Sequence, residues 1–96
     1  MRFEWDESKR RANLRKHGID FLECDTVFDG LTFTMEDQRF PYCEQCHITL
    51  GILNRRVVVI AHTETEEVIE IISIRKALRH EEARYYQHSP FPKIQD

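Results

Sequence analysis

The sequence predicts one α+β domain: a short N-terminal strand, two helices, about four antiparallel strands in a curved sheet, and a C-terminal helix. Two observations predict this class. Helical periodicity is confined to residues 6–29 and to the region after residue 74, whereas residues 31–74 contain alternating or continuous apolar segments. Such segregation is typical of helices packed on one side of an antiparallel sheet. The 96 residues suffice for one domain, residues 1–96, with residues 87–96 as an extended tail.

The N-terminal elements are predicted from alternation and from capping residues. Residues 3–5 alternate as in a short edge strand. Asp6 can accept from the free N–H groups of a first helix that runs to about His17, where Gly18 can adopt the left-handed conformation of a helix end. Asp20 then begins a second helix that ends at Asp29-Gly30. We expect its buried face to consist of Phe21, Cys24, Val27 and Phe28.

Four strands are predicted between residues 31 and 74. Residues 31–36 and 46–51 alternate between apolar and polar side chains, which indicates half-buried strands. Asn54-Arg55 provides a tight turn, because asparagine tolerates a positive φ. Residues 57–61 form a continuous apolar segment typical of a central strand, and residues 68–74 form the last strand.

The segment from Ser73 to Ala77 joins that last strand to the final helix. We expect Ser73 to cap the helix, with Ile74, Ala77, Leu78 and Tyr85 on its apolar face. Free N–H groups at a helix start bind anions, and Arg75, Lys76 and Arg79 add positive charge there. The segment predicts a phosphate site; the alternative is a basic, solvated helix face.

Positive charge also gathers at the end of the first helix. Residues 1–20 contain six basic and four acidic side chains, whereas residues 21–54 contain one basic and six acidic ones. Lys16 and His17 can donate to a phosphate or a transition state; the alternative is that they only stabilise the helix dipole. The net charge of −3 is not typical of a simple nucleic-acid binder.

Cys43-Glu44-Gln45-Cys46-His47 matches the C-x-x-C-H pattern of haem attachment, but no export signal precedes it. Zinc would need His47 and Cys24 as further ligands, yet Cys46 and His47 alternate on a strand. We predict no metal, no cofactor and no disulfide framework, with Cys43 ending a loop and Cys46 packing inward. A zinc- or thiol-dependent regulatory protein stays open as an alternative. Without an apolar run that could span a bilayer, we expect a cytoplasmic protein that does not bind a membrane.

Taken together, these sequence motifs resemble those of the BrnT family of type II toxins. The resemblance implies a fold like that of the RelE toxins, ribonuclease activity that arrests growth, and neutralisation by a ribbon-helix-helix antitoxin of the BrnA type. It also implies that DNA is bound only through that antitoxin. The residues that carry the resemblance are Phe3-Glu4-Trp5-Asp6, Lys9, Asn13, Lys16-His17-Gly18-Ile19, Phe21, Val27-Phe28, Asp37-x-Arg39, Gly51, Val57–Ile60, Ile71–Ala77, Glu81 and Tyr85.

The chain departs from the family pattern at three positions. Cys46 and Thr65 stand where the family has arginines, and Glu70 stands at a position that is often basic. Because fewer cations would then stabilise a phosphorane, there is an alternative function: a catalytically weakened or inactive toxin-fold module that binds an antitoxin and tunes promoter occupancy.

Metal-free RNA cleavage uses the 2′-OH as the nucleophile and needs a base, an acid and cations. We expect Arg75, supported by Lys16 and Arg79, to stabilise the developing charge. His17, Glu44 and His62 are the candidates for acid and base, and Tyr85 for base stacking or proton donation. The expected RNA-binding residues are Ser73, Lys76, Arg79 and Arg39.

Overall fold

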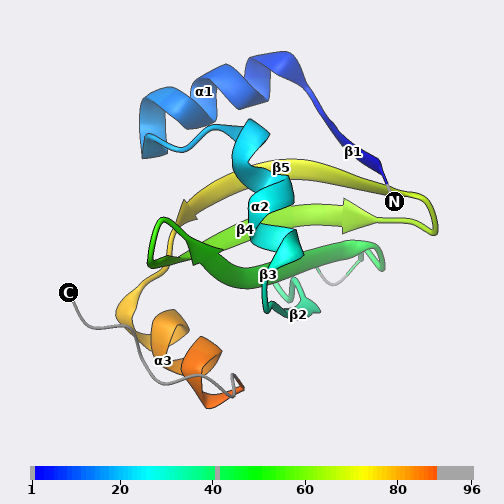
Figure 1. The fold of residues 1–96 in the computed structure, drawn as a ribbon. Helices are drawn as coiled ribbons and strands as arrows, with labels where there is room; N and C mark the ends of the chain where they lie inside the picture. The colour runs from blue at the N-terminus through cyan, green and yellow to red at the C-terminus, as the bar shows by residue number, and fades with distance from the viewer. Residues whose placement is uncertain (1, 41, 89–96) are drawn as a thin grey trace.

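Five strands form one sheet in the order β1-β5-β4-β3-β2 in the computed structural model, which describes residues 2–40 and 42–88 (Figure 1). The pairs β2–β3, β3–β4 and β4–β5 are antiparallel, and β1 lies parallel to β5 at the edge. The predicted α+β class is therefore confirmed. The elements are β1 (Arg2–Trp5), α1 (Glu7–His17), η1 (Phe21–Glu23), α2 (Cys24–Asp29), β2 (Phe33–Glu36), β3 (Cys46–Leu53), β4 (Arg56–Glu64), β5 (Val68–Lys76) and α3 (Arg79–Gln87).

The two ends of α1 follow the local rules of helix capping. The side chain of Asp6 accepts from the backbone N–H groups of Ser8 and Lys9. Gly18 has a φ of 72° and donates its N–H to the carbonyl of Leu14. Both ends lie where the sequence predicts them. The Asn54-Arg55 turn is also confirmed, with positive φ at both residues.

Helices cover both faces of the sheet, not one face as the segregation of elements suggested. A first core on one face joins η1 and α2 to Val58 and Ile60 of β4. A second core on the opposite face joins Tyr85 of α3 to Val57 and Val59 of the same strand. Alternating side chains of β4 therefore serve the two cores in turn. Figure 1 shows α2 crossing the strands while α3 lies apart from it.

The close approach of α2 to β3 depends on Gly51. A Cβ atom at this position would lie 2.5 Å from Cγ1 of Val27, a buried side chain of the first core. We expect Gly51→Ala to lower the free energy of unfolding by about 1–3 kcal/mol, because the added methyl group overpacks this contact. Urea denaturation would measure the change. Gly30→Ala is a matched control, since its Cβ would have only an ordinary contact, 3.6 Å from the carbonyl oxygen of Val27.

The final helix begins later than the sequence predicts. Strand β5 continues to Lys76, which pairs with Val58 of β4, and the N–H of Ala77 donates to the carbonyl of Val57. Ser73 and Ile74 therefore belong to the strand, and Ser73 does not cap α3. Pairing with a neighbouring strand outweighs the local helical pattern here. Gln87 is the last residue of α3, and the predicted tail from residue 89 onward lies outside the described residues.

The loop between β2 and β3 contains a disulfide bond between Cys43 and Cys46, contrary to the expectation of unpaired thiols. Successive turns bring the two Cα atoms to 5.5 Å, a normal separation for a disulfide. Within the described ranges, no group of three or more His, Cys, Asp or Glu side chains is placed to hold a metal ion. No helix in this part of the chain is long and apolar enough to cross a membrane.

Candidate functional site

The end of α1 and the end of β5 line one cavity of about 410 Å³, which we call the cation cavity. Its lining residues are Lys16, His17, Arg75, Lys76 and Leu78. An adjoining hollow of about 290 Å³ shares Lys16 and His17 and adds Ile72 and Ser73 of β5. Figure 1 shows the end of α1 above the arrowhead of β5, on the same side of the molecule. The two basic segments predicted at opposite ends of the sequence therefore meet.

Asn13 positions α1 beside β5. Strand β1 pairs with β5 only as far as Ile71, so the edge of β5 beyond it is open. The Asn13 amide takes the place of a strand partner there: Nδ2 donates to the carbonyl of Ile74 at 2.9 Å, and Oδ1 accepts from the N–H of Ile74 at 3.1 Å. Nδ2 also donates to the carbonyl of Ile19. Because Lys16 and His17 follow about one helical turn later, this contact sets their distance from Arg75.

The Arg75 guanidinium is held in a fixed orientation by Glu81 of α3. Two parallel hydrogen bonds of 2.8 Å join its Nη1 and Nη2 atoms to the two carboxylate oxygens. This pairing raises the pKa of Arg75 and holds the pKa of Glu81 below its usual range. The arginine therefore stays charged while its side chain is only 30% exposed.

A second guanidinium, that of Arg39, lies on the β2–β3 loop. Its Nε and Nη2 atoms donate to the buried carboxylate of Asp37 at 2.9 and 2.7 Å. This ion pair holds the pKa of Asp37 below its usual range. Arg39 lines a hollow of about 230 Å³ together with Ile72 and Ser73, which also line the hollow beside Lys16 and His17. We call the continuous surface from the cation cavity to Arg39 the groove.

The sequence from residue 5 to residue 81 matches a family model described as "Ribonuclease toxin, BrnT, of type II toxin-antitoxin system". The chain belongs to the BrnT family. Its structure is similar to the 1.1 Å crystal structure of the Brucella abortus ribonuclease toxin BrnT, with a TM-score of 0.61 and 24% sequence identity. The similarity covers 82% of this chain and 99% of that one. No curated protein matches the sequence significantly. The predicted family is confirmed, and a type II toxin implies an antitoxin partner.

Three residues that departed from the BrnT pattern gather at one end of the sheet. The strand register aligns Cys46 of β3 with Thr63 of β4, and Thr63 with Glu70 of β5. Thr65 follows directly after the end of β4. These three residues are therefore neighbours at one end of the strands, and Cys46 also lines the hollow of Arg39.

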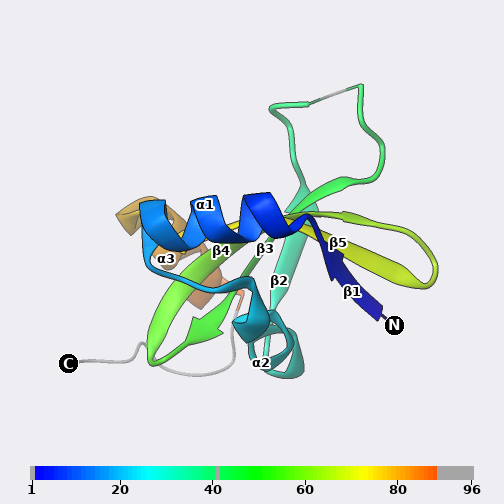
Figure 2. The ribbon, with the colours of Figure 1, turned by 90° about the horizontal axis from the view of Figure 1, so that it is seen from above.

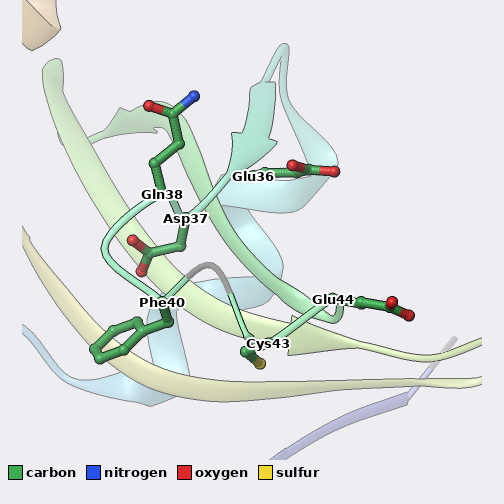
Figure 3. A pocket seen from close by; sticks show the side chains of 6 residues that line it. All are labelled: Glu36, Asp37, Gln38, Phe40, Cys43 and Glu44. Carbon is green, nitrogen blue, oxygen red and sulfur yellow. The ribbon is translucent and has the colours of Figure 1, made fainter.

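Glu44, a candidate acid or base, does not line the groove. It lies in the β2–β3 loop and lines another hollow with Glu36, Asp37, Gln38, Phe40 and Cys43, of which Asp37 and Phe40 also line the hollow of Arg39. In Figure 3, the carboxylates of Glu36 and Glu44 point to one side of the loop, away from the Phe40 ring. The structure therefore does not bring Glu44 to the lysines and arginines of the groove.

Tyr85 is buried in the second core, whereas His62 is buried on β4 and also lines the hollow of Arg39 and Ser73. His62 is 1% exposed, its Nε2 lies 2.6 Å from Oγ1 of Thr49, and burial lowers its pKa. The hydroxyl of Tyr85 donates to the carbonyl of Leu31 at 2.9 Å. Arg79 is exposed at the first residue of α3.

The remaining thiol, Cys24, is also a core residue. It is buried in the first core, and burial raises the pKa of its thiol to about 11. A protonated, buried thiol is neither a nucleophile nor a metal ligand at neutral pH. Cys24 therefore does not support a thiol- or zinc-dependent function.

The sequence pattern includes the two carboxylates that orient the arginines of the groove, Asp37 and Glu81, but it gave neither of them a role at the site. Asp37 stands two residues before Arg39, and Glu81 stands six residues after Arg75. The first spacing is a local signal that could have been used. The second spacing gives no such signal, because Glu81 reaches Arg75 only when the chain turns from β5 into α3.

Proposed function

We propose that the groove binds RNA and cleaves it without a metal ion, through attack of the 2′-OH on the adjacent phosphate. The observation that carries this proposal is the cation cavity, where α1 and β5 present positive side chains to one space. Arg75, Lys16 and Lys76 stabilise the charge that develops on the phosphate oxygens. Ser73 and Arg39 extend the contact along the RNA backbone.

His17 is the proposed proton-transfer residue. It is half-buried, lines both the cation cavity and the adjoining hollow, and is thus beside the proposed phosphate position. In the reaction, the 2′-oxygen loses its proton and bonds to phosphorus, and the bond from phosphorus to the 5′-oxygen breaks. The 5′-oxygen takes up a proton as it leaves. A histidine can serve either transfer near neutral pH.

The products test the mechanism. The purified chain, incubated with single-stranded RNA in the presence of EDTA, is expected to yield fragments with 2′,3′-cyclic phosphate and 5′-hydroxyl ends. The same sequence carrying 2′-deoxyribose throughout is expected to stay intact, because it lacks the nucleophile. A requirement for an added divalent cation, or products that end in a 3′-hydroxyl, would contradict the mechanism.

The proposed protein partner is a BrnA-like ribbon-helix-helix antitoxin, with DNA contacted only through it in the cytoplasm. The acidic segment of residues 21–54 supports a basic partner surface, since attraction between opposite charges accelerates association. Co-expression with the neighbouring open reading frame and a pull-down of the complex would test the pairing. Recovery of the toxin without a bound DNA-binding protein would argue against it.

The second candidate function is a toxin-fold module that binds an antitoxin without cutting RNA. Two observations favour it: the guanidinium groups of Arg39 and Arg75 are each paired with a carboxylate, and Cys46, Thr65 and Glu70 replace expected cations. Expression of the chain alone separates the two functions. An active ribonuclease arrests growth and degrades cellular RNA, whereas the module leaves both unchanged.

A further inference from the structure

Two aromatic side chains of the β2–β3 loop face solvent. Tyr42 is 81% exposed and Phe40 is 40% exposed, and Tyr42 is the most exposed of the large apolar side chains in the described ranges. Their ring centroids lie 6.0 Å apart with the planes at 75°, and Cζ of Arg39 lies 5.4 Å from the centroid of Phe40. Exposing aromatic rings to water is unfavourable, and a cluster of exposed aromatic side chains beside an arginine is typical of binding sites.

The loop is held in shape by its own bonds. The N–H of Asp37 donates to the carbonyl of Cys46, the N–H of Cys43 donates to the carbonyl of Phe40, and the disulfide closes the segment. Figure 2 shows the loop projecting from the body of the molecule, on the side of the sheet opposite α2. Both rings are therefore exposed on a loop whose described residues are joined by a disulfide and backbone hydrogen bonds.

Phe40, one member of the aromatic pair, adjoins the groove. Phe40 and Arg39 line the same hollow as Ser73, and Ser73 also lines the hollow that contains Lys16 and His17. Arg39 neutralises Asp37, and the carboxylates of Glu36 and Glu44 point away from the Phe40 ring (Figure 3). An aromatic surface at the end of a cationic groove suits a single-stranded nucleic acid, whose bases stack while its phosphates bind cations.

We propose that Phe40 and Tyr42 form a stacking platform for one unpaired RNA base, on the Arg39 side of the phosphate bound in the cation cavity. The inference rests on the proposed ribonuclease function and adds its substrate class: single-stranded RNA, read with little base preference at this position. Stacking uses the face that every base has, so the platform selects for unpaired bases and not for a sequence. A base held in a duplex cannot reach it.

Binding of an uncleavable RNA tests the platform. The probe is a short, fluorescein-labelled, single-stranded 2′-O-methyl oligonucleotide, and fluorescence anisotropy gives its Kd. Tyr42→Ala is expected to weaken binding about tenfold, whereas Tyr42→Phe, which keeps the ring, is expected to bind like the wild type. Leu22→Ala is the matched control, because Leu22 is also an exposed apolar residue, 58% exposed, but lies on η1.

An abasic scan through the same oligonucleotide identifies the stacked base. One abasic position is expected to weaken wild-type binding about tenfold and to have little further effect in Tyr42→Ala, because both changes remove the same contact. Equal losses in the two proteins would overturn the platform, as would unchanged RNA binding by Tyr42→Ala. Weakened antitoxin binding with unchanged RNA binding would assign the rings to a protein contact instead. A wild-type protein that neither binds nor cleaves RNA would refute the ribonuclease function itself.

Discussion

Replacement of Arg75 by alanine is expected to reduce RNA cleavage by about a hundredfold to a thousandfold, the usual effect of removing a preorganised group that stabilises an anionic transition state. Glu81 holds the guanidinium with two hydrogen bonds, and Arg75 lines a cavity together with Lys16 and His17. The rate constant for cleavage at saturating RNA should fall by a larger factor than the factor by which the Kd for RNA rises. Growth arrest on expression should be relieved to a similar degree.

Two further variants make this result specific. Arg75→Lys keeps the charge but loses the planar fork, so its activity should lie between those of the wild type and the alanine variant. Arg2→Ala removes an exposed arginine of β1 that lines none of these cavities, and it should cleave RNA at the wild-type rate. A thermal melt checks that Arg75→Ala is folded, since a partly exposed ion pair contributes only about 1 kcal/mol. Undiminished cleavage by a folded Arg75→Ala protein would remove Arg75 from the mechanism.

Asn13→Ala is expected to lower the free energy of unfolding by about 3–5 kcal/mol, the largest stability effect that we expect for one side chain. Asn13 is 6% exposed, and its amide satisfies the N–H and the carbonyl of Ile74 as well as the carbonyl of Ile19. Without the amide, these buried backbone groups lack partners, at about 1–3 kcal/mol each. Urea denaturation followed by circular dichroism would measure the loss.

The chemistry of the amide provides a sharper version of this test. Asn13→Asp keeps the acceptor for the N–H of Ile74 but loses the donor for two carbonyl oxygens, so it should be destabilised at neutral pH as well. Arg11→Ala, on an exposed position of the same helix, is the control and should change the stability by less than about 0.5 kcal/mol. A loss below about 1 kcal/mol for Asn13→Ala would mean that α1 is attached to β5 by other contacts.

Local sequence rules located several elements of the fold because their causes are local. Asp6 and Gly18 end α1 through bonds within a few residues, and the positive φ values at Asn54 and Arg55 belong to one two-residue turn. The apolar spacing of the second helix correctly identified its buried side. The prediction failed at Ser73, where hydrogen bonds from β4, distant in the sequence, keep the chain extended as far as Lys76.

The sequence by itself determined the family, the α+β class and the presence of basic residues near both ends of the chain. Only the tertiary structure decided which of them share a space. Asn13 docks α1 on the open edge of β5 and brings Lys16 and His17 to Arg75, while His62 and Tyr85 are buried and Glu44 points elsewhere. The physical reason is range: caps, turns and periodicity act over a few residues, whereas a site depends on hydrogen bonds and packing between segments up to 61 residues apart.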